Sequence, residues 1–324
     1  MKGAEGAGSA GSAGRGEPET LEMSSAPGTA GLYVRAVLPK SGGGRGRPVP
    51  ARRLVLRDVA ADPGRLRRYA GVCGFTGASR LPMTYPHIVA FPLTMSLMTR
   101  RDFPLPLLGL VHIANRIDRH RPVEAGERLT YRVWAGDLRP HPKGTAFDVT
   151  AEADDGARTV WRSVSTYLRR GRAAAGPAPG AGARSGGTAP GGAGGPGGPG
   201  GPGGPVLEER WEVPGSAGRA YAAVSGDRNP IHLHPLTARL FGFPRAIAHG
   251  MWTKARCLAA LEEHLPGACR VDVSFRAPVP LPSAVRFHAS GPAASAGGVL
   301  WDFALRGDGG AGREHLRGEV SLLD

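Results

Sequence analysis

A short segment of this chain holds a carboxylate, an amide and an imidazole within six residues. It reads Tyr-Ala-Ala-Val-Ser-Gly-Asp-Arg-Asn-Pro-Ile-His over residues 221–232 and contains Asp227, Asn229 and His232. Pro230 removes a backbone donor and disfavours helical geometry at Asn229, so we expect a turn here. A turn can aim all three side chains into one cleft. Aspartate beside histidine is a common pair for proton transfer, because histidine titrates near neutral pH and a carboxylate can orient it.

A longer stretch around this segment resembles the MaoC-like dehydratase family, which includes the (R)-specific enoyl-CoA hydratases. The match extends from Tyr221 to Met251 without an insertion and includes Gly242-Phe243 and the run Ile-Ala-His-Gly-Met at 247–251. Family members often carry Asp two residues after the motif histidine, where this chain has His234. The resemblance implies a hydro-lyase of fatty-acid metabolism. It would interconvert (3R)-hydroxyacyl and trans-2-enoyl thioesters of coenzyme A or acyl carrier protein.

The resemblance also implies roles for individual residues. Asp227 and His232 would carry the two proton transfers, and Asn229 would position the water or hydroxyl; which of the pair serves the water is left open. A backbone N–H near Gly250 would bind the thioester oxygen, because a helix start offers unpaired N–H groups and partial positive charge. The further substrate-binding positions would be Ser225, His249 and Met251, with His249 shaping the turn more than titrating.

Other functions of these residues stay open at this point. Asp227, His232 and His234 could be metal ligands, but the spacing lacks a fourth partner, and the resemblance implies neither a metal nor a cofactor. His87 could be a second catalytic histidine, although nothing acidic lies near it in sequence. The main alternative to an enzyme is a non-catalytic, thioester-binding subunit of a fatty-acid or polyketide assembly. A thioesterase on the same fold is a third possibility.

The composition limits the classes of partner. The 324 residues carry a formal net charge of +14. The basic residues are scattered and not interleaved with aromatic residues, which argues against nucleic-acid binding and is compatible with attraction of coenzyme A phosphates or an acidic carrier protein. There is no apparent signal peptide and no apolar run near 18 residues, so we expect a cytoplasmic protein without membrane insertion.

Two low-complexity segments divide the chain. Residues 1–30 are mainly Gly, Ala, Ser and Glu, and residues 171–205 are nearly all Gly, Ala and Pro. Neither can bury enough apolar surface to offset the entropy of ordering, so we expect a disordered tail and a flexible linker. The remaining ranges, 31–170 and 206–324, are each the size of one small domain.

The two halves repeat each other faintly. The pattern Arg-x-Tyr-Ala-x-Val-x-Gly occurs at residues 67–74 and again at 219–226. In this alignment Phe75 stands where Asp227 stands, and no Asn-Pro-x-His follows, so we expect the first copy to lack the catalytic motif. Its apolar residues Phe91, Leu93 and Met95 could be scaffold, or could line a tunnel for an acyl tail.

Each half also shows the same order of elements. Apolar residues at helical spacing predict a helix from about His249 to about Leu265, with an apolar counterpart at 91–98. Each half therefore predicts a mostly antiparallel sheet of about five strands wrapped around one helix, an α+β fold. The resemblance implies a double hotdog, two tandem repeats that pair as a pseudo-dimer, and a homodimer of such chains is possible. Alternating apolar residues predict strands at 54–59, 129–133, 147–151, 208–213, 271–275, 285–287 and 299–305.

Overall fold

The computed structural model describes residues 18–37, 47–77, 79–171, 205–291, 298–309 and 312–323. Residues 1–17 of the expected tail and 172–204 of the expected linker therefore lie outside the described residues. Within the described ranges, no helix is both long and apolar enough to span a membrane.

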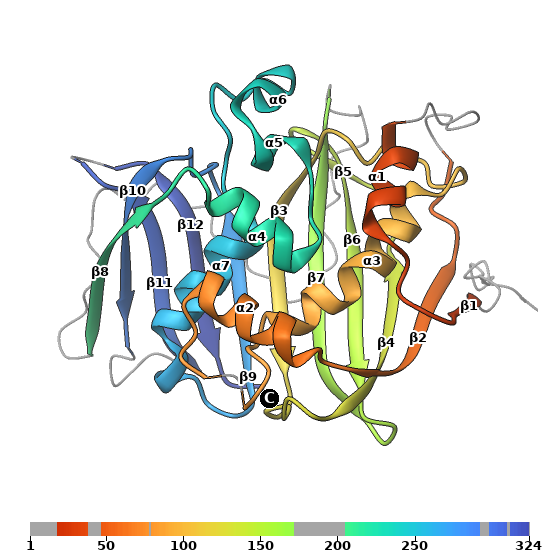
Figure 1. The fold of residues 1–324 in the computed structure, drawn as a ribbon, viewed down its shortest axis with the longest axis horizontal. Helices are drawn as coiled ribbons and strands as arrows, with labels where there is room; N and C mark the ends of the chain where they lie inside the picture. Colours follow the sequence, from red (N-terminus) through yellow and green to blue (C-terminus); the bar gives the residue numbers. More distant parts are fainter. Residues whose placement is uncertain are drawn as a thin grey trace, which may run out of the picture.

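One continuous sheet runs through both halves of the chain (Figure 1). The strands in chain order are β1 (Glu19–Met23), β2 (Arg52–Ala60), β3 (Leu110–Arg119), β4 (Arg128–Ala135), β5 (Arg139–His141), β6 (Gly144–Asp154), β7 (Thr159–Arg170), β8 (Val206–Val213), β9 (Cys269–Phe275), β10 (Ser283–Ser290), β11 (Val299–Gly307) and β12 (Glu314–Ser321). Their spatial order is β1-β2-β4-β6-β7-β3-β9-β12-β11-β10-β8, and β5 pairs with β6 to one side. Only the β1–β2 pair is parallel among the described strands.

The helices gather on one face of this sheet (Figure 1). They are α1 (Thr29–Val37), α2 (Pro63–Cys73), α3 (Tyr85–Thr99), α4 (Ala217–Ser225), α5 (Pro230–Leu233), α6 (Pro235–Leu240) and α7 (Gly250–Ala260), followed by the short 3₁₀ helix η1 (Glu262–His264). Apolar residues occupy most of α3, and nearly all of its side chains are buried, because it packs against strands β2, β4 and β6.

The two halves repeat the same strand order on either side of the β3–β9 pair. Moving outward from this seam, the first half runs β3-β7-β6-β4-β2 and the second half runs β9-β12-β11-β10-β8. The seam strands pair antiparallel from Ala114 opposite Ser274 to Arg119 opposite Cys269. Each half thus contains a run of five antiparallel strands and one central helix, α3 or α7, and the first half adds β1 and β5. This arrangement confirms the predicted α+β double hotdog.

Lys254 of α7 ties the central helix to the seam. Its side chain is completely buried, and Nζ donates to the carbonyl oxygen of Asn115 (3.0 Å), to the Asn115 Oδ1 (2.7 Å) and to the carbonyl oxygen of Val271 (3.1 Å). Asn115 belongs to β3 and Val271 to β9, so one side chain joins the two seam strands. Burial lowers the pKa of Lys254 to about 7.

Two of the differences from the sequence expectations concern the central helix of the second half and the N-terminal tail. The helix predicted to reach Leu265 ends at Ala260 and continues as η1. There Glu262 accepts hydrogen bonds from the backbone N–H and the hydroxyl of Thr76, a contact with the first half that the local pattern does not contain. The expected tail also differs near its end, because residues 19–23 form β1 and Thr29 begins α1.

Candidate active site

The motif turn is set by its own polar side chains. α4 ends at Ser225, and Gly226 follows with φ +82°, a left-handed conformation that glycine adopts without strain. Ser225 Oγ accepts the N–H of Asp227 at 3.1 Å, and Asp227 Oδ1 accepts the N–H of Asn229 at 3.1 Å. Asn229 Oδ1 in turn caps α5 by accepting the N–H of Ile231 at 3.4 Å. The predicted turn is therefore present, and Ser225 orients it by accepting a hydrogen bond at Oγ.

His232 lies on α5, which packs closely against α4. A side chain at Gly218 of α4 would place its Cβ 2.0 Å from the carbonyl oxygen of His232, so only glycine permits this approach. The ring is 9% exposed, and its Nδ1 lies 2.8 Å from the carbonyl oxygen of Ile247. Because a carbonyl only accepts hydrogen bonds, Nδ1 carries the proton and Nε2 of the neutral ring has a free lone pair.

His249 joins the turn to the start of α7. Its ring stacks on that of His232 with centroids 3.7 Å apart, and its Nε2 donates to the backbone carbonyl of Asp227 at 2.9 Å. The Nδ1 atom is buried without a hydrogen-bond partner in the described part of the chain. Burial, reinforced by the neighbouring His232, lowers the pKa of His249 to about 3, so the ring is neutral near pH 7. Its contacts position Asp227 and His232 relative to each other.

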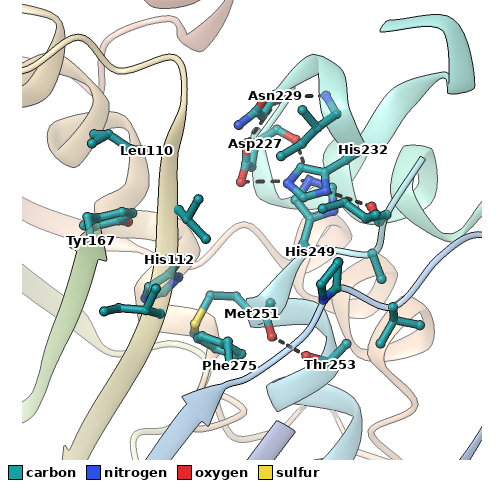
Figure 2. Close-up of a pocket in the computed structure, with 18 of the residues that line it drawn as sticks. Leu110, His112, Tyr167, Asp227, Asn229, His232, His249, Met251, Thr253 and Phe275 are labelled. Carbon is teal, nitrogen blue, oxygen red and sulfur yellow. Dashed lines mark hydrogen bonds and ion pairs between the residues drawn. The ribbon is translucent and has the colours of Figure 1, made fainter. Parts of the chain in front are cut away.

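The structure brings Asp227 and His232 together (Figure 2). A carboxylate oxygen of Asp227 and a ring nitrogen each of His232 and His249 lie within 4.8 Å of one another. Burial alone would raise the pKa of Asp227, but the two histidines and the hydrogen bonds from Tyr33 and the Asn229 N–H hold it below its ordinary value. Burial lowers the pKa of His232, and Asp227 opposes this. Near pH 7 the pair is therefore a carboxylate and a neutral imidazole, both able to accept a proton.

The same three side chains are spaced closely enough to hold a metal ion. His234 is not among them, because its Nδ1 caps α6 by accepting the N–H of Leu236 at 3.2 Å. Coordination through Nε2 of His249 would break its hydrogen bond to the Asp227 carbonyl.

The pair lies in the wall of a cavity of about 770 Å³ that both halves enclose. Figure 2 shows β3 and β7 supplying Leu110, His112 and Tyr167 opposite the motif turn. The sequence did not indicate His112 or Tyr167, because strand pairing alone brings β3 and β7 to the motif. Asp227 is the one acidic residue among those lining this cavity.

The first half also places His87 in the cavity wall. Its ring stacks on that of His112 at 6.3 Å, and burial lowers the pKa of His87 to about 4. Of the three apolar residues considered for an acyl tunnel, Phe91 lines this cavity, Met95 lines a smaller one, and Leu93 is in the core. Phe75, which occupies the position of the missing acid, is also buried in the core.

The start of α7 forms the floor of the cavity. Gly250 and Met251 line it, and the ring of Phe275 packs against Gly250. The first backbone hydrogen bond of the helix joins the N–H of Thr253 to the carbonyl of His249, so the N–H groups of the first turn precede the intrahelical ladder. Such groups are suited to bind a negatively charged oxygen.

Comparison with known proteins assigns the chain to a family. Residues 204–292 match the family model described as MaoC like domain. Over 275 residues the chain is 36% identical to the 3-hydroxyacyl-thioester dehydratase X of Mycobacterium tuberculosis, a match that covers 85% of this chain and 91% of that protein. The chain belongs to the MaoC-like dehydratase family. The resemblance seen in the sequence is therefore confirmed.

Solved structures of other MaoC-like proteins share the architecture. The crystal structure of HtdX of Mycobacterium tuberculosis is 34% identical and superposes with a TM-score of 0.66, over 84% of this chain and 100% of that one. A MaoC-like dehydratase from Phytophthora capsici, 17% identical, gives a TM-score of 0.62 over 86% of this chain and 96% of that one, which shows the common fold alone. A shorter match, 43% identical over 63 residues, is to the mitochondrial 3-hydroxyacyl-[acyl-carrier-protein] dehydratase of Arabidopsis thaliana. It spans 19% of this chain and 38% of that protein.

Proposed function

We propose that this MaoC-like protein is a hydro-lyase that interconverts trans-2-enoyl and (3R)-3-hydroxyacyl thioesters. The observation that carries the proposal is the Asp227–His232 pair in the wall of the 770 Å³ cavity, where Asp227 is the one acidic residue among the described lining residues. The 3-hydroxyacyl-thioester dehydratase name of the Mycobacterium tuberculosis relative, which aligns over most of both chains, supports the same reaction class.

The chemistry follows from the state of the pair. In the hydration direction, the oxygen of water bonds to C3 of the enoyl thioester, and a proton is added to C2. Either Asp227 or the free Nε2 of His232 takes the one proton that the water loses. The pair then delivers that proton to C2, so it ends each turnover as it began. The amide N–H groups of Asn229 are free to hold the water, because only its Oδ1 caps α5.

The developing charge on the thioester oxygen requires donors. We assign these to the backbone N–H groups of Gly250 and Met251 at the start of α7, with Ser225 and His249 supporting the turn that faces them. Such donors are effective because they are already oriented before the charge appears.

In the proposed substrate, the acyl group is carried as a thioester on a thiol that bears phosphate. Lys143 and Arg170 line the exposed part of the cavity, and neither forms an ion pair with a carboxylate in the described ranges. Unpaired basic side chains beside the entrance suit a coenzyme A phosphate or the phosphate of an acyl-carrier prosthetic group.

We further propose the division of labour expected from the sequence. Residues 206–324 would carry the catalytic motif, 31–170 would form the opposite wall, and 171–205 would link them. Homodimer formation and a cytoplasmic location stay predictions from the sequence.

The test is turnover of crotonyl-CoA by the full-length protein. Loss of the enoyl-thioester absorbance with formation of (3R)-3-hydroxybutyryl-CoA, identified by chiral chromatography, is the expected result. Tight binding of the thioester without turnover would indicate the non-catalytic alternative instead. Release of free thiol would indicate a thioesterase.

A further inference from the structure

The N-terminal helix α1 lies against the motif turn, although the two are far apart in sequence. Leu32 of α1 is buried against Phe91 and Met95 of α3. A side chain at Gly226 in the motif would come within 3.3 Å of Thr29, so the start of α1 is in contact range of the turn. The preceding strand β1 pairs with β2 and anchors the segment to the sheet.

Tyr33 of α1 contacts the Asp227 carboxylate directly. Its hydroxyl donates to Oδ1 at 2.6 Å, and the N–H of Asn229 donates to the same oxygen at 3.1 Å. Oδ2 accepts no hydrogen bond from the described residues, and Nε2 of His249 lies 3.9 Å from it. Both donors therefore occupy one oxygen and leave the other as the free acceptor.

Tyr33 reaches Asp227 from outside the large cavity. It is not among the residues that line that cavity, but it lines a separate cavity of about 50 Å³ with Asp227 and Asn229. A thioester in the large cavity would thus meet Asp227 and not Tyr33. Burial, followed by the charge of Asp227, raises the pKa of Tyr33, so its hydroxyl stays protonated and donates.

We propose that Tyr33 is a positioning residue for Asp227, which fixes Oδ1 so that Oδ2 is the oxygen that exchanges protons with the substrate water. The inference rests on the proposed hydratase function for its catalytic consequence. It gives α1, which lies outside the matched MaoC domain of residues 204–292, a part in the active site of the second half.

The test is Tyr33→Phe, which removes the hydroxyl and keeps the ring. We expect kcat for crotonyl-CoA to fall by about tenfold or more, because small displacements of a group that reacts with the substrate are costly to the rate. KM should stay within about threefold, because Tyr33 does not meet the substrate. Carbon-13 NMR of aspartate-labelled protein should show a raised pKa for Asp227, because a lost donor favours the protonated acid. Val34→Ala, at a neighbour that is 64% exposed on the same helix, should change none of these.

The two readouts separate this inference from the hydratase proposal. The Asp227 signal is assigned by its absence in Asp227→Asn, and its titration needs no turnover. A raised pKa in Tyr33→Phe would support the positioning role even if the wild-type protein hydrated no enoyl thioester. Wild-type kcat together with an unchanged pKa of Asp227, in a Tyr33→Phe protein of unchanged melting temperature, would overturn it.

Discussion

At the scale of single residues, the site depends on which atoms are left free. Hydrogen bonds to backbone carbonyls fix the protons of His232 and His249, and the donors on Asp227 occupy only Oδ1. Among the described residues, Asp227 and His232 then keep one carboxylate oxygen, Oδ2, and one lone pair, on Nε2, without a hydrogen bond, and the buried Nδ1 of His249 is also unpartnered. In the proposed reaction, Oδ2 of Asp227 and Nε2 of His232 act on one substrate, so their contributions to the rate should be coupled.

We therefore expect Asp227 and His232 to behave as a unit. Asp227→Asn keeps the shape and removes the base, and it should reduce kcat by about 10²–10⁴-fold, as should His232→Ala. The double variant should be scarcely slower than either single variant, because removing one member already disables the pair. Steady-state hydration of crotonyl-CoA measures all three. Losses that multiply in the double variant would instead show independent roles, and melting curves would exclude unfolding as the cause.

The protonation state of the pair predicts the pH profile. Activity needs a neutral His232, whose pKa burial lowers below its ordinary 6.5, and a charged Asp227, whose pKa lies below 3.8. Both pKa values are lowered, so both conditions hold at neutral pH and fail only on acidification. We expect kcat/KM for crotonyl-CoA to be constant from about pH 8 to about pH 7 and to fall only below pH 6.5. A fall centred above pH 6.5 would contradict the role of neutral His232.

At the scale of elements, close helix packing delivers the motif to the cavity. α4 carries the residues before the turn, and its C-terminal carbonyls at Val224 and Ser225 accept hydrogen bonds from Arg65 of α2 at 2.7 and 3.2 Å. A cation at a helix C-terminus stabilises the unpaired carbonyls there. The first half therefore holds the helix that presents the motif turn of the second.

Gly218 gives a direct test of this packing. In Gly218→Ala the new Cβ would lie 2.0 Å from the carbonyl oxygen of His232, so α5 must move away from α4. We expect kcat for crotonyl-CoA to fall by about tenfold or more, since small displacements of a catalytic group are costly, and the melting temperature to drop.

Gly71→Ala is the matched control, because that glycine lies inside α2 with nothing within 4 Å of the new Cβ. There alanine should stabilise the helix by roughly 0.5–1 kcal/mol and leave activity unchanged. Equal melting temperatures and rates in the two variants would show that the α4–α5 contact is not required.

At the scale of the whole molecule, the cavity exists only because the two halves share one sheet. The seam strands β3 and β9, tied together by Lys254, place the walls of the first half opposite the motif of the second. Of the charged side chains in these walls, the basic ones lie on exposed parts of the lining and the one carboxylate lies in the motif turn.

Charge reversal at the cavity entrance should weaken substrate binding without altering the chemistry. For Lys143→Glu we expect KM for crotonyl-CoA to rise severalfold, about 3–10-fold, with kcat nearly unchanged, and the difference to shrink at high salt as the charges are screened. Arg67→Glu is the control for overall charge, since Arg67 is exposed on α2 and does not line the cavity. If both variants raise KM equally, the overall positive charge of the protein attracts the thioester, and Lys143 does not contribute specifically to substrate binding.

The sequence by itself determined the motif turn, the family and the class of fold. The turn could be predicted because glycine, asparagine and proline between residues 226 and 230 favour turns locally. The fold class could be predicted because alternating or helical spacing of apolar residues indicates which face of one element is buried. Tertiary structure alone decided which distant groups meet this turn. Tyr33 reaches Asp227 across 194 positions through helix packing. Strand pairing places His112 and Tyr167 in the cavity wall opposite the turn, and Lys254 reaches the seam across 139 positions. The local pattern predicts whether a side chain is buried. Contacts between remote segments depend instead on which strands pair and how the helices pack on the sheet.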